Sequence, residues 1–127
     1  MLKEFQHQSS LSFEDTIETL KELFMKKKYG TLCSISLSDK FKEKNIPFDS
    51  KLTILEICNP LEANKLITIN TKAMFLLPCK VLVIEKNGKT TVELVLPTSF
   101  MSLFDDPALT KAAQEIETAI VNTILEV

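Results

Sequence analysis

The segment Cys79–Leu96, "CKVLVIEKNGKTTVELVL", predicts a β-hairpin and is the clearest structural signal in the chain. Asn87 and Gly88 lie at its centre, between two runs rich in β-branched residues. Both central residues of a type I′ turn need positive φ angles, which Asn and Gly adopt readily, so this pair favours a tight connection between antiparallel strands. The fold is therefore expected to contain a sheet in which neighbouring segments run antiparallel.

The segment 13–29 predicts the first helix. Its apolar residues recur at spacings of three and four and form one face of a helix: Phe13, Ile17, Leu20 and Phe24. Ser12 followed three residues later by Asp15 resembles a capping box, which indicates where the helix begins. Gly30 can adopt the left-handed conformation that often ends a helix, so we expect the helix to end just before it.

The remaining elements are read from alternation, proline and capping residues. We expect three strands, at residues 2–8, 31–37 and 51–58. We also expect a short helix at residues 38–45, capped by Ser38 or Asp39. Residues 61–73 are expected to form a helix started by Pro60, and the last helix is expected to begin at Asp106-Pro107. In the segment 31–37, Cys33 shares a face with Ile35 and Leu37, and we expect it to lie in the core.

This order is β-α-β-α-β-α-β-β-α and predicts a single α+β domain over residues 1–127. The expected architecture is one largely antiparallel, curved sheet of about five strands with helices packed on one face. The strand 80–86 carries Val81 and Val83 on one face but Leu82 and Ile84 on the other. Helices on one side would leave the second face apolar and uncovered. Such surface marks an interaction site, so we expect a homodimer or a small apolar ligand there.

The composition excludes several classes of partner. All 15 basic residues are lysine and the formal net charge is −2, so nucleic-acid binding is not expected. The longest apolar-rich run, residues 73–84, is interrupted by lysine and proline and is far shorter than the roughly 20 residues that cross a bilayer. The first ten residues lack the apolar segment of a signal peptide. We therefore expect a cytoplasmic protein with its three cysteines reduced.

Cys79 directly follows Pro78, and Cys58 lies two residues before Pro60; each cysteine is at a predicted strand boundary, on either side of a predicted helix. One interpretation is that both thiols are small apolar residues of the core. The other is that they converge on a site for redox exchange or for a soft metal ion. The two thiols could meet if their strands run antiparallel, whereas parallel strands would place them at opposite ends of the sheet. Both arrangements are open at the level of the sequence.

Other candidate groups are weaker. Lys44 and Lys80 could flank the two thiols and bind an anion or stabilise a thiolate. Asn59 is expected mainly to cap the helix that Pro60 begins. The two glycines are accounted for by a helix end and a turn, and no phosphate-binding loop, Ser-His-Asp set or HExxH motif is present. An enzyme of an ordinary type is therefore not expected, and neither is a cofactor other than a metal at the thiols.

Two motifs resemble a known family. The first motif is Cys58–Pro60 with Ala63, and the second is Leu76–Val81. They are similar to motifs in one branch of the uncharacterised prokaryotic family called domain of unknown function 302. Residues 13–46, which include the segment Lys42–Lys44, are also similar to the family. The resemblance covers about residues 10 to 105. Lys80 replaces an asparagine of that branch, and Phe75 replaces a glycine.

The resemblance implies a small α+β fold on a curved sheet, often dimeric, and no established activity. We therefore predict a small cytoplasmic homodimeric binding or regulatory module. The alternative is a thiol-based redox or soft-metal-handling protein that uses Cys58 and Cys79. The candidate functional residues are Cys58, Asn59, Pro60, Cys79, Lys80 and Lys44.

Overall fold

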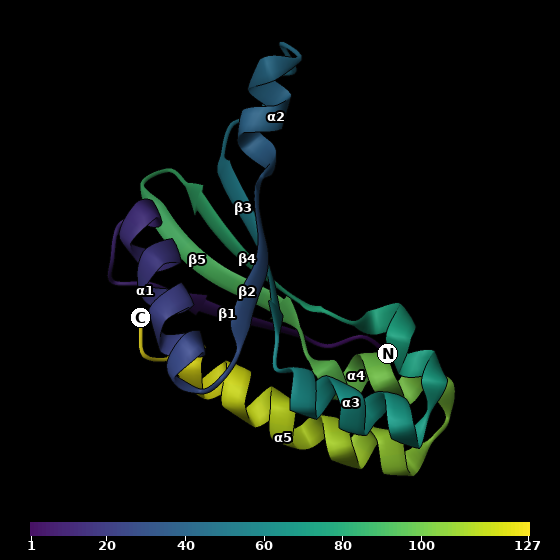
Figure 1. Cartoon of the computed structure of the whole chain (residues 1–127). Helices are drawn as coiled ribbons and strands as arrows, with labels where there is room; N and C mark the ends of the chain where they lie inside the picture. The colour runs from purple at the N-terminus through teal and green to yellow at the C-terminus, as the bar shows by residue number, and fades with distance from the viewer.

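A computed structural model describes all residues, 1–127. Its centre is a five-stranded sheet with the order β1-β5-β4-β3-β2, in which every neighbouring pair is antiparallel. The sheet is curved and does not close, and helices cover one of its faces, so the predicted α+β class is confirmed (Figure 1). The strands are β1 (Glu4–Gln8), β2 (Gly30–Ser36), β3 (Lys51–Cys58), β4 (Cys79–Lys86) and β5 (Lys89–Val95).

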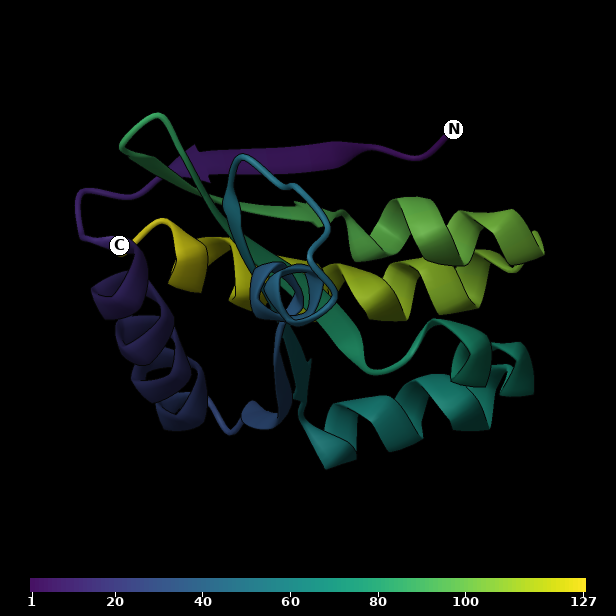
Figure 2. The ribbon, with the colours of Figure 1, turned by 90° about the horizontal axis from the view of Figure 1, so that it is seen from above.

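Five α-helices and two short 3₁₀ helices connect the strands. They are α1 (Phe13–Lys26), α2 (Leu37–Glu43), α3 (Pro60–Ile69), η1 (Thr71–Leu76), α4 (Pro97–Met101), η2 (Ser102–Phe104) and α5 (Pro107–Ile124). Figure 1 shows α2 standing away from one end of the sheet, while α3 and α4 lie at the other end. Seen from above, α2 points along the line of sight (Figure 2). No helix combines the length and the apolar character needed to cross a membrane.

The hairpin of β4 and β5 forms as predicted. Asn87 and Gly88 have φ angles of 53° and 76°, so both take the left-handed conformation that a type I′ turn requires. Lys86 and Lys89 are in register on either side of the turn. The hairpin supplies the centre of the sheet, because β1 adds to the free edge of β5 and β3 adds to the free edge of β4.

The first helix begins where predicted but ends earlier. The Ser12 hydroxyl accepts a hydrogen bond from the Asp15 backbone N–H at 3.1 Å, which confirms the cap. The helix ends at Lys26, and Lys28 rather than Gly30 takes the left-handed conformation, with φ of 67°. The Tyr29 N–H then bonds to the Phe24 carbonyl at 2.9 Å, and the Tyr29 ring enters the core. The prediction for Gly30 is wrong because burying Tyr29 fixes the end of the helix.

Cys33 is exposed, so its predicted place in the core is wrong. Thr31 pairs with Ile57 and Cys33 pairs with Glu56, so Leu32 is an extra residue in a β-bulge. The extra residue in β2 changes the face on which the following residues lie, so Cys33 and Ile35 share the face of Glu56 and Ile54. That face points away from the helices. The alternation itself is present, but it belongs to the other side of the sheet.

Two helix boundaries also differ from prediction. The cap of α2 is Ser36, whose hydroxyl accepts from the Asp39 N–H, rather than Ser38 or Asp39. Helix α3 ends at Ile69 because Asn70 is extended, with φ of −154° and ψ of 117°. The Asn70 side chain then accepts from the Lys72 N–H and donates to Asp106, which starts η1 in place of further α-helix.

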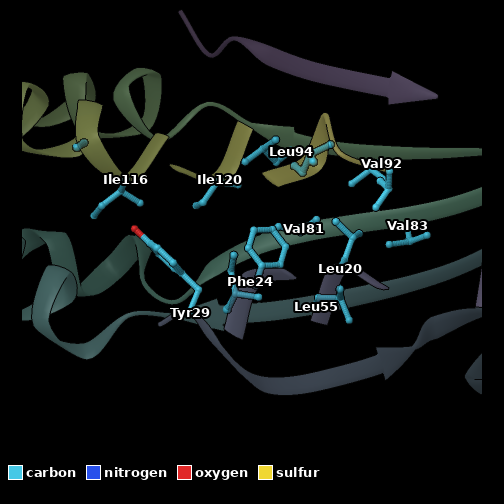
Figure 3. Packing of buried hydrophobic residues seen from close by; sticks show 14 of the residues in the cluster. Leu20, Phe24, Tyr29, Leu55, Val81, Val83, Val92, Leu94, Ile116 and Ile120 are labelled. Carbon is cyan, nitrogen blue, oxygen red and sulfur yellow. The ribbon is translucent and has the colours of Figure 1, made fainter. Parts of the chain in front are cut away.

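The hydrophobic core lies between the sheet and the helices α1 and α5. Alternate residues of β3, β4 and β5 point into it, and Figure 3 shows them meeting side chains of the two helices. The fully buried members include Leu20, Phe24, Leu55, Val81, Val83, Val92 and Ile120. At 25–30 cal/mol per Å², removing one of these large side chains costs about 2–5 kcal/mol once the cavity is included.

The opposite side of the sheet, called here the outer face, is divided into two halves. Ile35, Ile54 and Leu82 are in register on β2, β3 and β4, and Leu52 and Ile84 form the next row. The row that contains Leu82 continues over β5 and β1 as Glu93 and Gln6. The row that contains Ile84 continues as Thr91 and Gln8. The outer face is therefore apolar over β2–β4 and polar over β5–β1.

Candidate functional site

The two thiols of the predicted site lie at the same end of the sheet. Strands β3 and β4 are antiparallel, and Cys79 is in register with Ile57, the residue before Cys58. Of the two arrangements left open by the sequence, the antiparallel one is therefore present. However, consecutive residues of a strand point to opposite faces, so Cys79 packs against the core while Cys58 belongs to the outer face. The two thiols are neighbours that point to opposite sides of the sheet.

This arrangement disfavours thiol chemistry. Burial raises the pKa of the Cys79 thiol to about 12, with smaller contributions from Cys58 and Glu56, and burial also raises the pKa of Cys58. A raised pKa depletes the thiolate, which is the reactive and metal-binding form. Both cysteines are free thiols. No group of three or more His, Cys, Asp or Glu side chains is arranged to hold a metal ion, whereas a tetrahedral site needs further ligands beside two thiols.

Asn59 and Pro60 have a structural role. The Asn59 side-chain oxygen accepts hydrogen bonds from the N–H groups of Leu61 and Glu62, at 3.1 and 3.3 Å. Pro60 is the first residue of α3, where its fixed φ angle suits the helix and its missing N–H costs nothing. The motif Cys58–Pro60 therefore ends β3 and begins α3.

Lys80 lies on the outer face and forms an ion pair with Glu56 of the neighbouring strand. The Lys80 side chain is largely exposed, while that of Glu56 is only 12% exposed. The Glu56 Oε2 atom is buried and has no hydrogen-bond partner. Lys80 therefore provides the compensation for a carboxylate held in a nearly dry position, and its charge is already engaged.

Lys44 does not belong to this region. It is the C-cap of α2, in the connection from β2 to β3. That connection leaves the sheet at the end opposite to Cys58, as the positions of α2 and α3 show in Figure 1. The structure thus brings together Cys58, Asn59, Pro60, Cys79 and Lys80, and separates Lys44 from them.

A cavity of about 370 Å³ lies beside Lys80 and was not predicted from the sequence. It opens where β4 begins and β5 ends, between the segment Phe75–Pro78 and helix α4. Leu82 of the outer face lies on its floor, and Phe100 and Met101 of α4 line another side. The bond between Leu77 and Pro78 in its wall is a cis peptide. Most of the lining is apolar, and its charged members are Glu4, Lys80 and Glu93.

Helix α4, which lines this cavity, is held by a buried carboxylate. Glu117 of α5 is 8% exposed, and its oxygens accept from the Thr98 hydroxyl at 2.8 and 3.1 Å. Glu117 also accepts from the Thr98 N–H and from the Gln114 side chain, at 3.4 and 3.2 Å. Since α4 has no side-chain cap of its own, Glu117 supplies the acceptor for its first turn. The position of Phe100 and Met101 therefore depends on Glu117.

The sequence contained weak signals for this cavity. The run "SFMSLF", residues 99–104, is too apolar for an exposed loop, and the aromatic residue Phe75 directly precedes "LLPC". The two segments are separated by the whole β4–β5 hairpin, so no spacing rule joins them. Phe75 is 81% exposed, which is unusual for an aromatic residue beside an apolar cavity.

Comparisons with known proteins agree with the fold. The family model of the domain of unknown function DUF302 matches residues 5–127. A crystal structure of an uncharacterized conserved protein DUF302 from Bacillus stearothermophilus is similar, with a TM-score of 0.93 and 32% sequence identity. The similarity covers 95% of this chain and 94% of that chain. No curated protein matches the chain. Since the match spans nearly the whole sequence, the chain belongs to the family of the domain of unknown function DUF302.

Proposed function

We propose that this protein is a binding module for a small, largely apolar molecule, and that the molecule occupies the cavity between η1, α4 and the outer face. The observation that carries this proposal is the cavity itself, with a volume of about 370 Å³ and a mainly apolar lining. Binding sites for small molecules are concave, mostly apolar and of roughly 300–1,000 Å³, with a few polar groups that orient the ligand. The site proposed from the sequence contributes Cys79 and Lys80 to its rim.

The hydrophobic effect would supply most of the binding energy. Leu77, Leu82 and Met101 contribute apolar surface to the cavity, and the aromatic rings of Phe75 and Phe100 lie on its sides. Burial of apolar ligand surface against such walls is worth about 25 cal/mol per Å² before the costs of association. Phe75 is largely exposed without a ligand, so it is the group whose surroundings would change most on binding.

The test uses N-phenyl-1-naphthylamine, a neutral fluorescent probe whose emission rises in apolar surroundings. The unmodified chain has no tryptophan. The probe is excited at wavelengths longer than those that tryptophan absorbs, so its emission can also be compared in variants that carry an introduced tryptophan. We expect saturable binding to the unmodified protein, and a loss of at least about tenfold in affinity for Leu82→Trp, because the larger ring fills the cavity. Ile84→Trp is the matched control, since Ile84 lies on the same face of the same strand but does not line the cavity.

If Leu82→Trp binds the probe as tightly as the unmodified protein, the cavity is not the site and the proposal is wrong. If Ile84→Trp loses binding to the same extent, the probe binds across the outer face rather than in the cavity. Native mass spectrometry of protein purified without chelator gives an independent readout, since a retained small molecule would appear as a fixed added mass.

The proposal includes assembly as a homodimer through the apolar half of the outer face. Two adjacent rows of apolar side chains lie on three strands with no helix over them. They consist of Ile35, Ile54 and Leu82, and of Leu52 and Ile84. Helix α2 has no buried residue, although it carries Leu37 and Phe41 and is followed by the exposed Ile46 and Phe48. Apolar surface of this extent favours association. Light scattering of the purified protein at micromolar concentration measures the molar mass directly.

A cytoplasmic location also remains part of the proposal. Cys33 is exposed, and free exposed thiols persist most readily in a reducing compartment. The redox alternative has no support in the arrangement of Cys58 and Cys79, since both pKa values are raised.

A further inference from the structure

We infer that the cavity selects amphiphiles with a positively charged group, such as a protonated alkyl amine, over anionic ones. This inference rests on the proposed function, because it names the class of ligand for the same cavity. It follows from the charges around the cavity and from how each of them is already engaged.

Lys80 is the single basic residue of the lining, and its charge is compensated. Its ammonium group is paired with Glu56, whose second oxygen is buried without any other partner. An anionic ligand that drew Lys80 away would leave the Glu56 carboxylate nearly buried and unpaired. Leaving a nearly buried carboxylate unpaired is more costly than an exposed ion pair to a ligand is favourable. Lys80 is therefore a poor anchor for an anion.

The charges of the two acidic residues in the lining, in contrast, are not paired with a lysine. Neither Glu4 nor Glu93 forms an ion pair with any lysine of the chain, although the chain has eight such pairs elsewhere. Glu93 accepts one hydrogen bond, from the Thr91 hydroxyl at 3.0 Å. Glu93 is in register with Leu82 on one side and Gln6 on the other, so its strand position lies beside the cavity floor. These carboxylates are the unpaired charges of the site.

The surroundings strengthen the preference. Glu93 is half-buried beside a cavity whose lining is mostly apolar, so the effective dielectric constant is below that of water and attraction between charges is larger. The aromatic rings of Phe75 and Phe100 also line the cavity, and a cation near an aromatic face gains further energy. The lining holds two carboxylates, Glu4 and Glu93, and one ammonium group, that of Lys80, which is paired with Glu56 outside the lining. An alkyl ammonium ion therefore satisfies the carboxylates while its chain fills the apolar part.

The experiment displaces bound N-phenyl-1-naphthylamine with three probes of equal chain length: octylamine, which is protonated at pH 7, octanoate and 1-octanol. We expect octylamine to bind about tenfold more tightly than octanoate, with octanol between them, as expected for about 1.4 kcal/mol of charge preference. Glu93→Gln should remove most of that preference and leave octanol binding unchanged. Glu18→Gln is the matched control, since Glu18 is an exposed residue of α1 on the other side of the sheet.

The outcomes separate the two proposals. If octanol displaces the probe but octylamine and octanoate bind equally, charge selection is wrong while the binding site stands. If octanoate binds most tightly, Lys80 is the selecting charge and the inference is overturned. If none of the three displaces the probe and the probe itself does not bind, the proposed function fails. An octylamine preference that survives in Glu93→Gln would also overturn the role given to Glu93.

Discussion

At the scale of single residues, His7 is the side chain least satisfied by its surroundings. It is half-buried on β1 in register with Val92, and its Nε2 atom is buried with no hydrogen-bond partner. A buried polar atom without a partner costs about 1–3 kcal/mol. We therefore expect His7→Leu, which keeps the size of the side chain, to raise the free energy of unfolding by about 1 kcal/mol.

Urea unfolding followed by circular dichroism measures this change. The midpoint should rise while the slope stays constant, which would show that stability rather than the unfolded state has changed. Gln6→Leu is the control, because Gln6 is an exposed neighbour on the same strand and its replacement should stay within about 0.5 kcal/mol. A lower midpoint for His7→Leu would mean that Nε2 has a partner, such as an ordered water.

Cys79 gives a prediction about alkaline pH. Its pKa is raised from the ordinary 9.0 to about 12 in the folded protein, chiefly by burial. Between these two values the unfolded chain loses the proton and the folded chain keeps it, so stability falls as pH rises. One such group lowers the free energy of unfolding by up to about 1.4 kcal/mol per pH unit. Below pH 9 both states hold the proton and the effect is absent.

The measurement compares Cys79→Val with the unmodified protein in urea, at pH values from about 8 to 11 and with reducing agent present. Cys58 and Tyr29 also have raised pKa values, mainly through burial, and they remain in both proteins. The variant should therefore lose less stability with rising pH, whatever its stability at the lowest pH. Parallel curves for the two proteins would contradict the raised pKa of the Cys79 thiol in the folded protein.

Residue roles were predictable from sequence where the cause is local. The caps at Ser12, Asn59 and Asp106 depend on the three residues that follow each of them, and all three are confirmed. Cys33 was predicted wrongly because its face is set by pairing with β3 and by the bulge at Leu32, which no local pattern records. Glu117 was not identified, because its partner Thr98 lies 19 residues away on another helix.

At the scale of elements, α4 is the short helix on which the cavity depends. It has five residues and no cap of its own, so it is held by Glu117 of α5. We expect Glu117→Ala to lower the free energy of unfolding by about 2 kcal/mol, because the half-buried donors of Thr98 lose their partner. Binding of N-phenyl-1-naphthylamine should weaken as well, since Phe100 and Met101 are carried by α4.

The two readouts distinguish a positioning role from general damage to the fold. Glu115→Ala is the matched control, on an exposed site of the same helix, and should change neither stability nor binding by much. Binding is measured at a temperature where both variants are folded. If Glu117→Ala destabilises the protein but binds the probe with unchanged affinity, α4 is not a required wall of the cavity.

Elements could be predicted well where turn chemistry is strong and poorly where tertiary contacts decide. The hairpin with Asn87-Gly88 is confirmed to within a residue, since its turn needs nothing beyond its own sequence. Helix α3 is shorter than predicted, because Asn70 leaves the helix to bond with Asp106 at the start of α5. The apolar run after β5 has Pro97 at the first position of α4 but no side-chain cap of its own, and Glu117 of α5 supplies the missing acceptor.

In the whole molecule, the order of the strands explains why the layout of helices and sheet could be predicted from the sequence and why the cavity could not. Helices on one face of an antiparallel sheet follow from the hairpin and the apolar periodicities, and that layout is confirmed. The cavity takes its lining from β1, β4, β5, η1 and α4, which meet only after the sheet has formed. A site assembled from five segments leaves no motif in any one of them.

The division of the outer face into an apolar and a polar half makes the proposed homodimer sensitive to where a charge is introduced. If the apolar half over β2–β4 is the contact between two copies, a charge at its centre should separate them. Ile54 is in register with Ile35 on one side and Leu82 on the other, so it occupies that centre. We expect Ile54→Lys to convert a dimer into a monomer, because a lysine buried in an apolar contact without a partner costs several kcal/mol.

Light scattering during size exclusion measures the result, against the chain mass of 14.3 kDa. The unmodified protein should show twice this mass and Ile54→Lys should show the single mass. Thr91→Lys adds the same charge to the polar half of the same face, so it should remain dimeric. The monomeric variant should stay folded, since Ile54 faces away from the core and a monomer leaves the introduced ammonium group in water. An unmodified protein that is monomeric at micromolar concentration would contradict the homodimer, whereas a dimer that persists in Ile54→Lys would place the contact elsewhere on the surface.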